Sequence, residues 1–262
     1  MLAIFSGLLL SVGDRYVIRI VLDERAVGLY AVGYGVATAL GTLVTRPLNL
    51  FAFPAYTKVW DTKGSRDTSA LLARMMEGYL MIYLPLIAVI WVWGGQALVV
   101  LAGARYLEAA PVVTIVFIAL FFQGAANVTV AGLYLENRTW TVGLLTLGMA
   151  LVNLGANAVV VPRAGLLGAA LVTLGTYAAH FAAVSAFSLR RLRVPLAFRR
   201  VGLTVATCGL AAALALGLER WAGVPFPAAL AVGVVAYVAL LTGADAELRR
   251  GAQSVVRYWS RP

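Results

Sequence analysis

Three charged residues, Asp14, Arg15 and Arg19, lie in an otherwise apolar stretch over residues 1–21. In a helix over these residues, Asp14 would lie roughly 12 Å from the outer end. An arginine at position 19 can extend to the lipid headgroups, but a short carboxylate cannot. Because one charge at mid-bilayer costs about 2.5 to 3.5 kcal/mol, Asp14 needs a partner or water. Two interpretations stay open: an ion pair with Arg15 that locks neighbouring helices together, or the charged wall of a transport cavity.

Four further polar residues interrupt apolar stretches. Arg46 lies close enough to the end of its stretch to extend to the headgroups, so a topological anchor is favoured over a ligand contact. Asn153 and Asn157 are four residues apart and share a helix face. Such a pair can bind a neutral sugar or hydrogen-bond a neighbouring helix, and the second case is commoner. Together the candidate residues of a substrate cavity are Asp14, Arg15, Arg19, Arg46, Asn127, Asn153 and Asn157.

Signals for enzymatic or metal chemistry are missing from the sequence. The one histidine, His180, lies in an apolar stretch without Glu or Cys at ligand spacing, so we interpret it as a core residue. The one cysteine, Cys208, allows neither an intrachain disulfide nor a cysteine metal site. The sequence contains no glycine-rich phosphate loop, nucleophile elbow or metal motif. We therefore expect no enzymatic activity, no cofactor and no metal.

The composition places these candidates in a membrane. Hydrophobic residues make up 62% of the 262 residues and charged ones 12%, and the mean hydropathy is +0.89, far from the values of soluble domains. Beside the first stretch, uncharged runs of spanning length recur at Ala26–Thr45, Gly78–Ala104, Ala109–Leu135, Thr139–Pro162, Ala164–Leu189, Val201–Leu218 and Trp221–Ala244. The runs are continuous and do not alternate as barrel strands do. They predict an all-α polytopic membrane protein of about eight transmembrane helices.

The basic residues predict orientation. The net charge is +10, which in a soluble protein would suggest nucleic-acid binding. Fourteen basic residues fall after the even-numbered spans: Lys58, Lys63, Arg66, Arg74, Arg138, Arg190, Arg191, Arg193, Arg199, Arg200, Arg249, Arg250, Arg257 and Arg261. Only four fall after the odd-numbered spans: Arg25, Arg105, Arg163 and Arg220. This asymmetry predicts that both termini are cytoplasmic and leaves no need for a nucleic-acid partner.

Three segments carry a family resemblance. They are Asp14–Ile18 with Ala26–Tyr34 (DRYVI and AVGLYAVGY), Gly103–Ala110 (GARYLEAA) and Val161–Ala170 (VPRAGLLGAA). In order and spacing they resemble the second lobe of Wzx-like polysaccharide-exporting flippases. These belong to the multidrug/oligosaccharidyl-lipid/polysaccharide superfamily, whose MATE-like transporters have two six-helix lobes around a central cavity. The resemblance extends from about Ser11 to Leu196.

The resemblance implies a fold and a function. Residues 1–196 would form the six-helix bundle of the second lobe, and residues 197–262 two additional helices with a basic cytoplasmic tail. The chain would then be a fragment or half-transporter of the cytoplasmic membrane, whose first lobe is missing or supplied by a second chain. It would translocate a polyprenyl-pyrophosphate-linked oligosaccharide for cell-surface polysaccharide export, with Arg15 and Arg19 contacting the headgroup or glycan and Asp14 orienting them.

Two other functions stay open from the sequence. The first is multidrug or cation efflux by a protein of the same superfamily. The second is a membrane-embedded glycan polymerase or ligase, but that class would need a sizeable outer loop with catalytic groups. The predicted outer connections are only a few residues long, which disfavours an enzyme.

Overall fold

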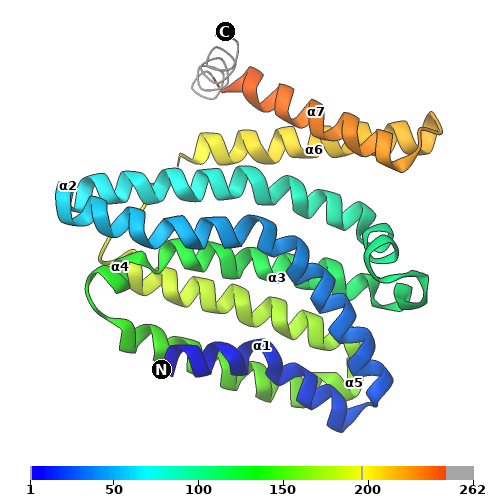
Figure 1. The fold of residues 1–262 in the computed structure, drawn as a ribbon, viewed down its shortest axis with the longest axis horizontal. Coiled ribbons are helices and arrows are strands. Elements are labelled where there is room, and N and C mark those ends of the chain that lie inside the picture. Colours follow the sequence, from blue (N-terminus) through cyan, green and yellow to red (C-terminus); the bar gives the residue numbers. More distant parts are fainter. Residues whose placement is uncertain (1, 196, 246–262) are drawn as a thin grey trace. The chain divides into compact units, whose positions relative to one another are not determined.

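The regular structure of the described chain is helical throughout. A computed structural model describes residues 2–195 and 197–245. Its elements, coloured along the chain in Figure 1, are α1 (Leu2–Val21), α2 (Glu24–Ala102), the 3-10 helix η1 (Ala104–Ala109), α3 (Ala110–Thr129), α4 (Ala131–Leu135), α5 (Thr139–Ser188), α6 (Phe198–Trp221) and α7 (Phe226–Ala244). The predicted all-α class is confirmed.

Two helices are much longer than one membrane crossing. A straight helix of the 79 residues of α2 would measure about 120 Å, against a hydrocarbon core of about 30 Å. The chain instead reverses at Gly64, whose φ of 81° and ψ of −170° leave the helical region, and Figure 1 shows α2 doubling back there. Gly165 interrupts the 50-residue α5 in the same way, with a φ of 56°. A positive φ is accessible to glycine at little cost, so one residue suffices for each reversal.

The structure corrects the predicted number of spans. Five helical segments of the described residues are long and apolar enough to cross a membrane: Glu24–Ala102, Ala104–Leu135, Thr139–Ser188, Phe198–Trp221 and Phe226–Ala244. The prediction of about eight separate transmembrane helices is therefore wrong as a count. The predicted connection between Ala26–Thr45 and Gly78–Ala104 lies inside α2, and the one around Pro162 lies inside α5. Helix α1 carries three charges among its 20 residues. The five segments still indicate a multi-pass membrane protein.

The described helices group into two compact units. The first contains α1, η1, α3, α4, α5 and most of α2, and the second contains α6 and α7 with the segment Leu80–Val89 of α2. The predicted division into residues 1–196 and 197–262 as separate bundles stays a prediction. The basic residues of the predicted tail, Arg249, Arg250, Arg257 and Arg261, lie outside the described residues.

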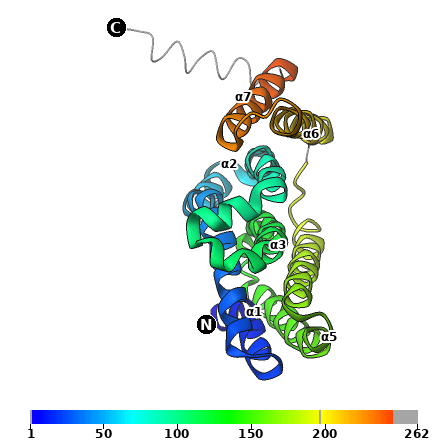
Figure 2. The same cartoon turned by 90° about the vertical axis from the view of Figure 1, so that its right-hand side faces the viewer.

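In the first unit, α5 is the helix against which both α1 and α3 pack, as Figures 1 and 2 show together. Small residues permit close approach between helices. A Cβ added to Gly33 of α2 would lie 3.1 Å from the carbonyl oxygen of Ala109. One added to Gly124 of α3 would overlap the ring and hydroxyl of Tyr79, which donates a hydrogen bond to the Phe121 carbonyl at 2.8 Å. A side chain at position 124 would therefore overlap Tyr79, and one at position 33 would need its neighbours on η1 and α3 to shift.

In the second unit, α6 and α7 form a hairpin. Helix α7 contacts α2 where a proline interrupts the backbone hydrogen bonds of α2. Pro85 has no N–H, so the carbonyl of Met81, four residues earlier, loses its helical donor. The Tyr237 hydroxyl of α7 donates to that carbonyl at 2.6 Å. An ion pair of 3.0 Å between Arg200 and Asp245 joins the start of α6 to the end of α7.

A cavity and a buried polar network in the first unit

The turn between α1 and α2 brings the charged part of α1 against the start of α2. Asp23 caps α2, because its carboxylate accepts a hydrogen bond of 2.6 Å from the backbone N–H of Ala26. The chain therefore reverses within two residues of the end of α1. This reversal places Asp14 beside Tyr30, 16 residues later.

Asp14 is buried, with 1% of its surface exposed, and its carboxylate oxygens have two different partners. One accepts a hydrogen bond of 2.6 Å from the hydroxyl of Tyr30, and the other accepts one of 2.8 Å from the backbone N–H of Arg15. The Tyr30 hydroxyl also lies 3.2 Å from the Thr173 hydroxyl of α5. Asp14 therefore joins α1, α2 and α5 through one tyrosine. Such hydrogen bonds offset the large cost of burying a carboxylate.

A second pair of hydroxyl groups, from two tyrosines, lies one helical turn further along α2 and α5. The hydroxyls of Tyr34 and Tyr177 are 3.1 Å apart. Both this pair and the Tyr30–Thr173 pair join residues 143 positions apart, so α2 and the second half of α5 run in the same direction here. The guanidinium of Arg15 lies over the ring of Tyr34, 4.8 Å from its centre, a cation–π contact.

The Arg15 guanidinium keeps donors that the described residues do not fill. Its Nη1 makes a hydrogen bond of 3.5 Å, at the limit of distance, to the Ser11 carbonyl, and its buried Nε has no partner among the described residues. Arginine presents five N–H donors, and carboxylates and phosphates are the acceptors that fit this fork best. Since the Asp14 oxygens are bonded elsewhere, the structure gives the two charged neighbours different environments.

The asparagines of α5 form a third polar group, also buried. Asn157 donates to the side-chain oxygen and to the carbonyl of Asn153, at 3.0 Å each. Asn153 donates to the hydroxyl of Thr176 at 2.9 Å, across the two halves of α5 that Gly165 separates. Within the described chain, the side-chain oxygen of Asn157 is buried without a hydrogen-bond donor. This arrangement matches the interhelical use of the pair.

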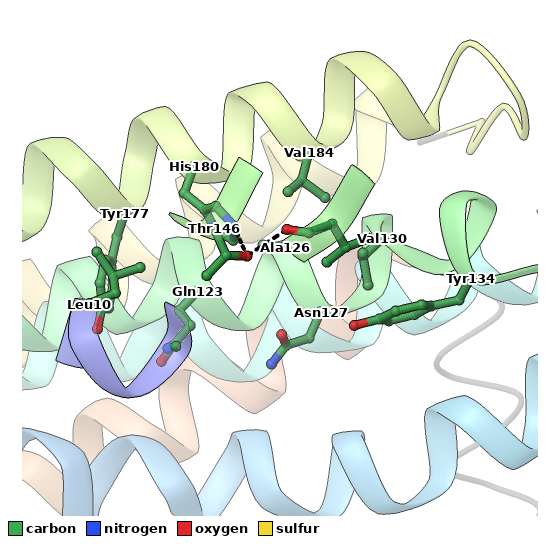
Figure 3. A pocket seen from close by; sticks show the side chains of 12 residues that line it. Leu10, Gln123, Ala126, Asn127, Val130, Tyr134, Thr146, Tyr177, His180 and Val184 are labelled. Carbon is green, nitrogen blue, oxygen red and sulfur yellow. Dashed lines mark hydrogen bonds between the residues drawn. The ribbon is translucent and has the colours of Figure 1, made fainter. Parts of the chain in front are cut away.

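A cavity of about 180 Å³ lies beside this network (Figure 3). Its lining comes from α1, α3, α4 and α5 and consists of Gly7, Leu10, Gln123, Ala126, Asn127, Val130, Tyr134, Val142, Thr146, Tyr177, His180 and Val184. His180 lies 3.2 Å from the hydroxyl of Thr146, and Figure 3 shows Tyr134 pointing toward Asn127. Tyr177 belongs to both the cavity and the network, so the two are adjacent.

A second, more open cavity of about 200 Å³ adjoins the first. Asn127, Val130 and Tyr134 line both, and the second adds Asn49, Ala52, Phe53 and Tyr56 of α2. The side chain of Asn127 donates a hydrogen bond of 3.2 Å to that of Asn49. Both asparagines are exposed, so a hydrogen bond between two exposed side chains connects α2 and α3 at this point.

The candidate residues predicted from the sequence therefore do not form a single site. Asp14 and Arg15 belong to the buried network, Asn153 and Asn157 form the asparagine pair, and Asn127 lines both cavities. The other two arginines lie at the surface. Arg19 is exposed and pairs with Glu24 at 3.3 Å, and Arg46 is exposed on α2.

Sequence reasoning missed the tyrosines. Tyr30 and Tyr34, like Thr173 and Tyr177, are four residues apart and lie on one helix face. That shared spacing is a signal in the sequence, but it indicates contact only once the two helix segments are known to be neighbours. Tyr134 carries no comparable signal, because no polar residue lies four positions from it within α4. Gln123 lies four residues before Asn127 on α3, so that spacing was a signal that sequence reasoning did not use.

One comparison bears on function. Residues 1–111, which contain α1, α2 and η1, match the model of a family described as polysaccharide biosynthesis protein. The matched part includes Asp14, Arg15, Tyr30 and Tyr34 of the network. No curated protein matches the chain. The chain is thus similar to polysaccharide biosynthesis proteins over its first 111 residues.

Proposed function

We propose that the chain takes part in moving a polyprenyl-pyrophosphate-linked oligosaccharide across the cytoplasmic membrane for cell-surface polysaccharide export. The observation that carries the proposal is the match of residues 1–111 to polysaccharide biosynthesis proteins, in a chain with five apolar helical segments of spanning length. A polar cavity between such helices is the feature that a water-soluble glycan requires in order to cross hydrocarbon.

In this proposal the residues of the first unit have different roles. The Arg15 fork, with its unfilled donors, offers hydrogen bonds to an anionic pyrophosphate. Asp14 holds Tyr30 in place by accepting its hydrogen bond. Tyr30 is one turn from Tyr34 on α2, so Asp14 also supports the Tyr34–Tyr177 pair that lies between Arg15 and the cavity. The step is transport without covalent chemistry, and both termini lie in the cytoplasm, as the basic residues predict.

The alternatives differ in what a cell without the chain would show. Multidrug efflux predicts lower tolerance to cationic dyes, and a glycan polymerase or ligase predicts altered glycan length. The family match names polysaccharide biosynthesis, which favours a glycan over a drug as the cargo.

The test is the leaflet in which lipid-linked glycan resides in cells that lack the chain. We expect the glycan to accumulate on the cytoplasmic face, where a membrane-impermeant glycosidase added to spheroplasts cannot reach it. Restoring the wild-type gene should return it to the outer face, with unchanged length and unchanged dye tolerance. A wild-type leaflet distribution in the deletion strain would refute the proposal.

A further inference from the structure

We infer that the two adjoining cavities of the first unit bind the neutral sugar end of the lipid-linked substrate, and that the pyrophosphate is bound elsewhere. The inference rests on the proposed function, since it assigns one part of that substrate to one site. We call this site the sugar subsite, defined by Asn49, Gln123, Asn127 and Tyr134.

The chemistry of the lining carries the inference. None of the described residues that line either cavity is an aspartate, glutamate, lysine or arginine. The polar groups are side-chain amides, hydroxyls and one histidine ring. Amides both donate and accept, as sugar hydroxyls do, whereas a pyrophosphate only accepts and favours cationic donors. An uncharged cavity therefore suits a neutral sugar and offers nothing specific to an anion.

Aromatic residues complete a surface for sugar rings. Tyr134 and Tyr177 line the first cavity, and Phe53 and Tyr56 line the second. The apolar C–H face of a sugar ring packs on aromatic side chains, and the hydroxyls of Tyr56 and Tyr134 add polar groups to those of the amides. Phe53 lies edge-on to both tyrosines, at 5.5 Å from Tyr56 and 6.4 Å from Tyr134 between ring centres.

The size of the space fits a small group. Each cavity measures about 200 Å³ or less, below the roughly 300 to 1,000 Å³ of sites that enclose a drug-sized ligand. Each is therefore suited to about one sugar unit, and the two cavities are neighbours because Asn127, Val130 and Tyr134 line both.

The hydrogen bond between Asn49 and Asn127 lies where the two cavities meet. Both side chains are exposed, and their one bond is 3.2 Å long. A bond between two neutral, exposed amides is readily exchanged for bonds to hydroxyl groups. Sugar hydroxyls can therefore replace it, and Asn127, which faces both cavities, is the residue expected to determine glycan recognition.

The cationic group lies apart from this lining. Arg15 lines neither cavity. Its guanidinium lies over the ring of Tyr34, whose hydroxyl is 3.1 Å from that of Tyr177 in the lining of the first cavity. Sugar and pyrophosphate would thus be bound by different residues of the same unit.

The experiment is saturation-transfer-difference NMR on the full chain in lipid nanodiscs. The probes are the methyl glycosides of glucose, galactose and N-acetylglucosamine, each with and without inorganic pyrophosphate. We expect saturation transfer to at least one glycoside. The Asn127→Leu variant should weaken its Kd about tenfold, the effect of losing roughly one net hydrogen bond. The amide-retaining Asn127→Gln should weaken it less.

The matched control is Gln96→Leu, which removes an exposed amide from α2 outside both cavities and should bind as the wild type does. Three results would each overturn the inference: no glycoside binding by the wild type, equal binding by Asn127→Leu, or displacement of the glycoside by pyrophosphate. Failure of the proposed function is a separate result. It would appear as Asn127-dependent glycoside binding by a chain whose deletion leaves the leaflet distribution of glycan unchanged.

Discussion

Replacing Tyr30 by phenylalanine should destabilise the first unit more than the loss of any other single hydroxyl in the network. The hydroxyl of Tyr30 donates to the Asp14 carboxylate at 2.6 Å and lies 3.2 Å from that of Thr173, and Tyr30 is fully buried. Hydrogen bonds to charged groups contribute about 1.5 to 3 kcal/mol, and neutral ones between membrane helices about 0.6 kcal/mol. The expected loss in unfolding free energy is therefore about 2 to 4 kcal/mol.

A double-mutant cycle with Asp14→Leu, which removes the acceptor of the Tyr30 hydroxyl, isolates the bond itself. Neutral pairs between membrane helices reach at most about 1.7 kcal/mol, so a coupling above that value is expected if the Asp14 carboxylate is the acceptor. The assay is reversible unfolding in mixed micelles with increasing SDS, followed by circular dichroism. Tyr16→Phe serves as the matched control, because Tyr16 is on α1 and 67% exposed. If Tyr30→Phe were as stable as Tyr16→Phe, the network would not hold α1 to α2 and α5.

The remaining predictions concern helix contacts. Tyr237→Phe should lower the free energy of unfolding by about 1 to 3 kcal/mol, because it leaves the Met81 carbonyl without a donor. In a Pro85→Ala background, where residue 85 supplies an N–H to that carbonyl, the same unfolding assay should show no such loss. Gly124→Val should cost about 1 to 3 kcal/mol or more through overlap with Tyr79. Gly148→Val, at a position where an added Cβ meets nothing within 4 Å, is its control, and equal losses in the two variants would contradict the close crossing.

Composition was enough to predict the fold class, because long apolar runs in lipid leave helices as the consistent structure. The number of separate helices was not predictable in the same way. The uncharged runs Ala26–Thr45 and Gly78–Ala104 predicted two helices joined by a connection, but the chain reverses at Gly64 and stays helical on both sides. A sequence pattern shows where helices are interrupted, and it does not show how many residues the interruption takes.

The candidate site was predictable only in part. Charge in an apolar stretch singled out Asp14 and Arg15, which do lie in a buried network. Their partners across helices, Tyr30 and Tyr34, come from α2. Each tyrosine in turn contacts a residue of α5 that lies 143 positions further along the chain, so the network depends on how the helices pack. Asn127 was identified from its polarity alone, and its role at the junction of two cavities follows from the positions of α2 and α5.

The central claim, that the glycan of a lipid-linked oligosaccharide enters the cavity of the first unit, can be tested by photo-crosslinking in the membrane. A benzophenone amino acid replaces Gln123 in the cavity lining or, as a control, Leu151, which is 56% exposed on α5. Substrate labelled in its sugars is crosslinked, and mild acid then cleaves the pyrophosphate. We predict that the sugar label stays on the protein at position 123 and is released at position 151, where the crosslink would be to the lipid. Equal retention at both positions, or release at both, would contradict the claim.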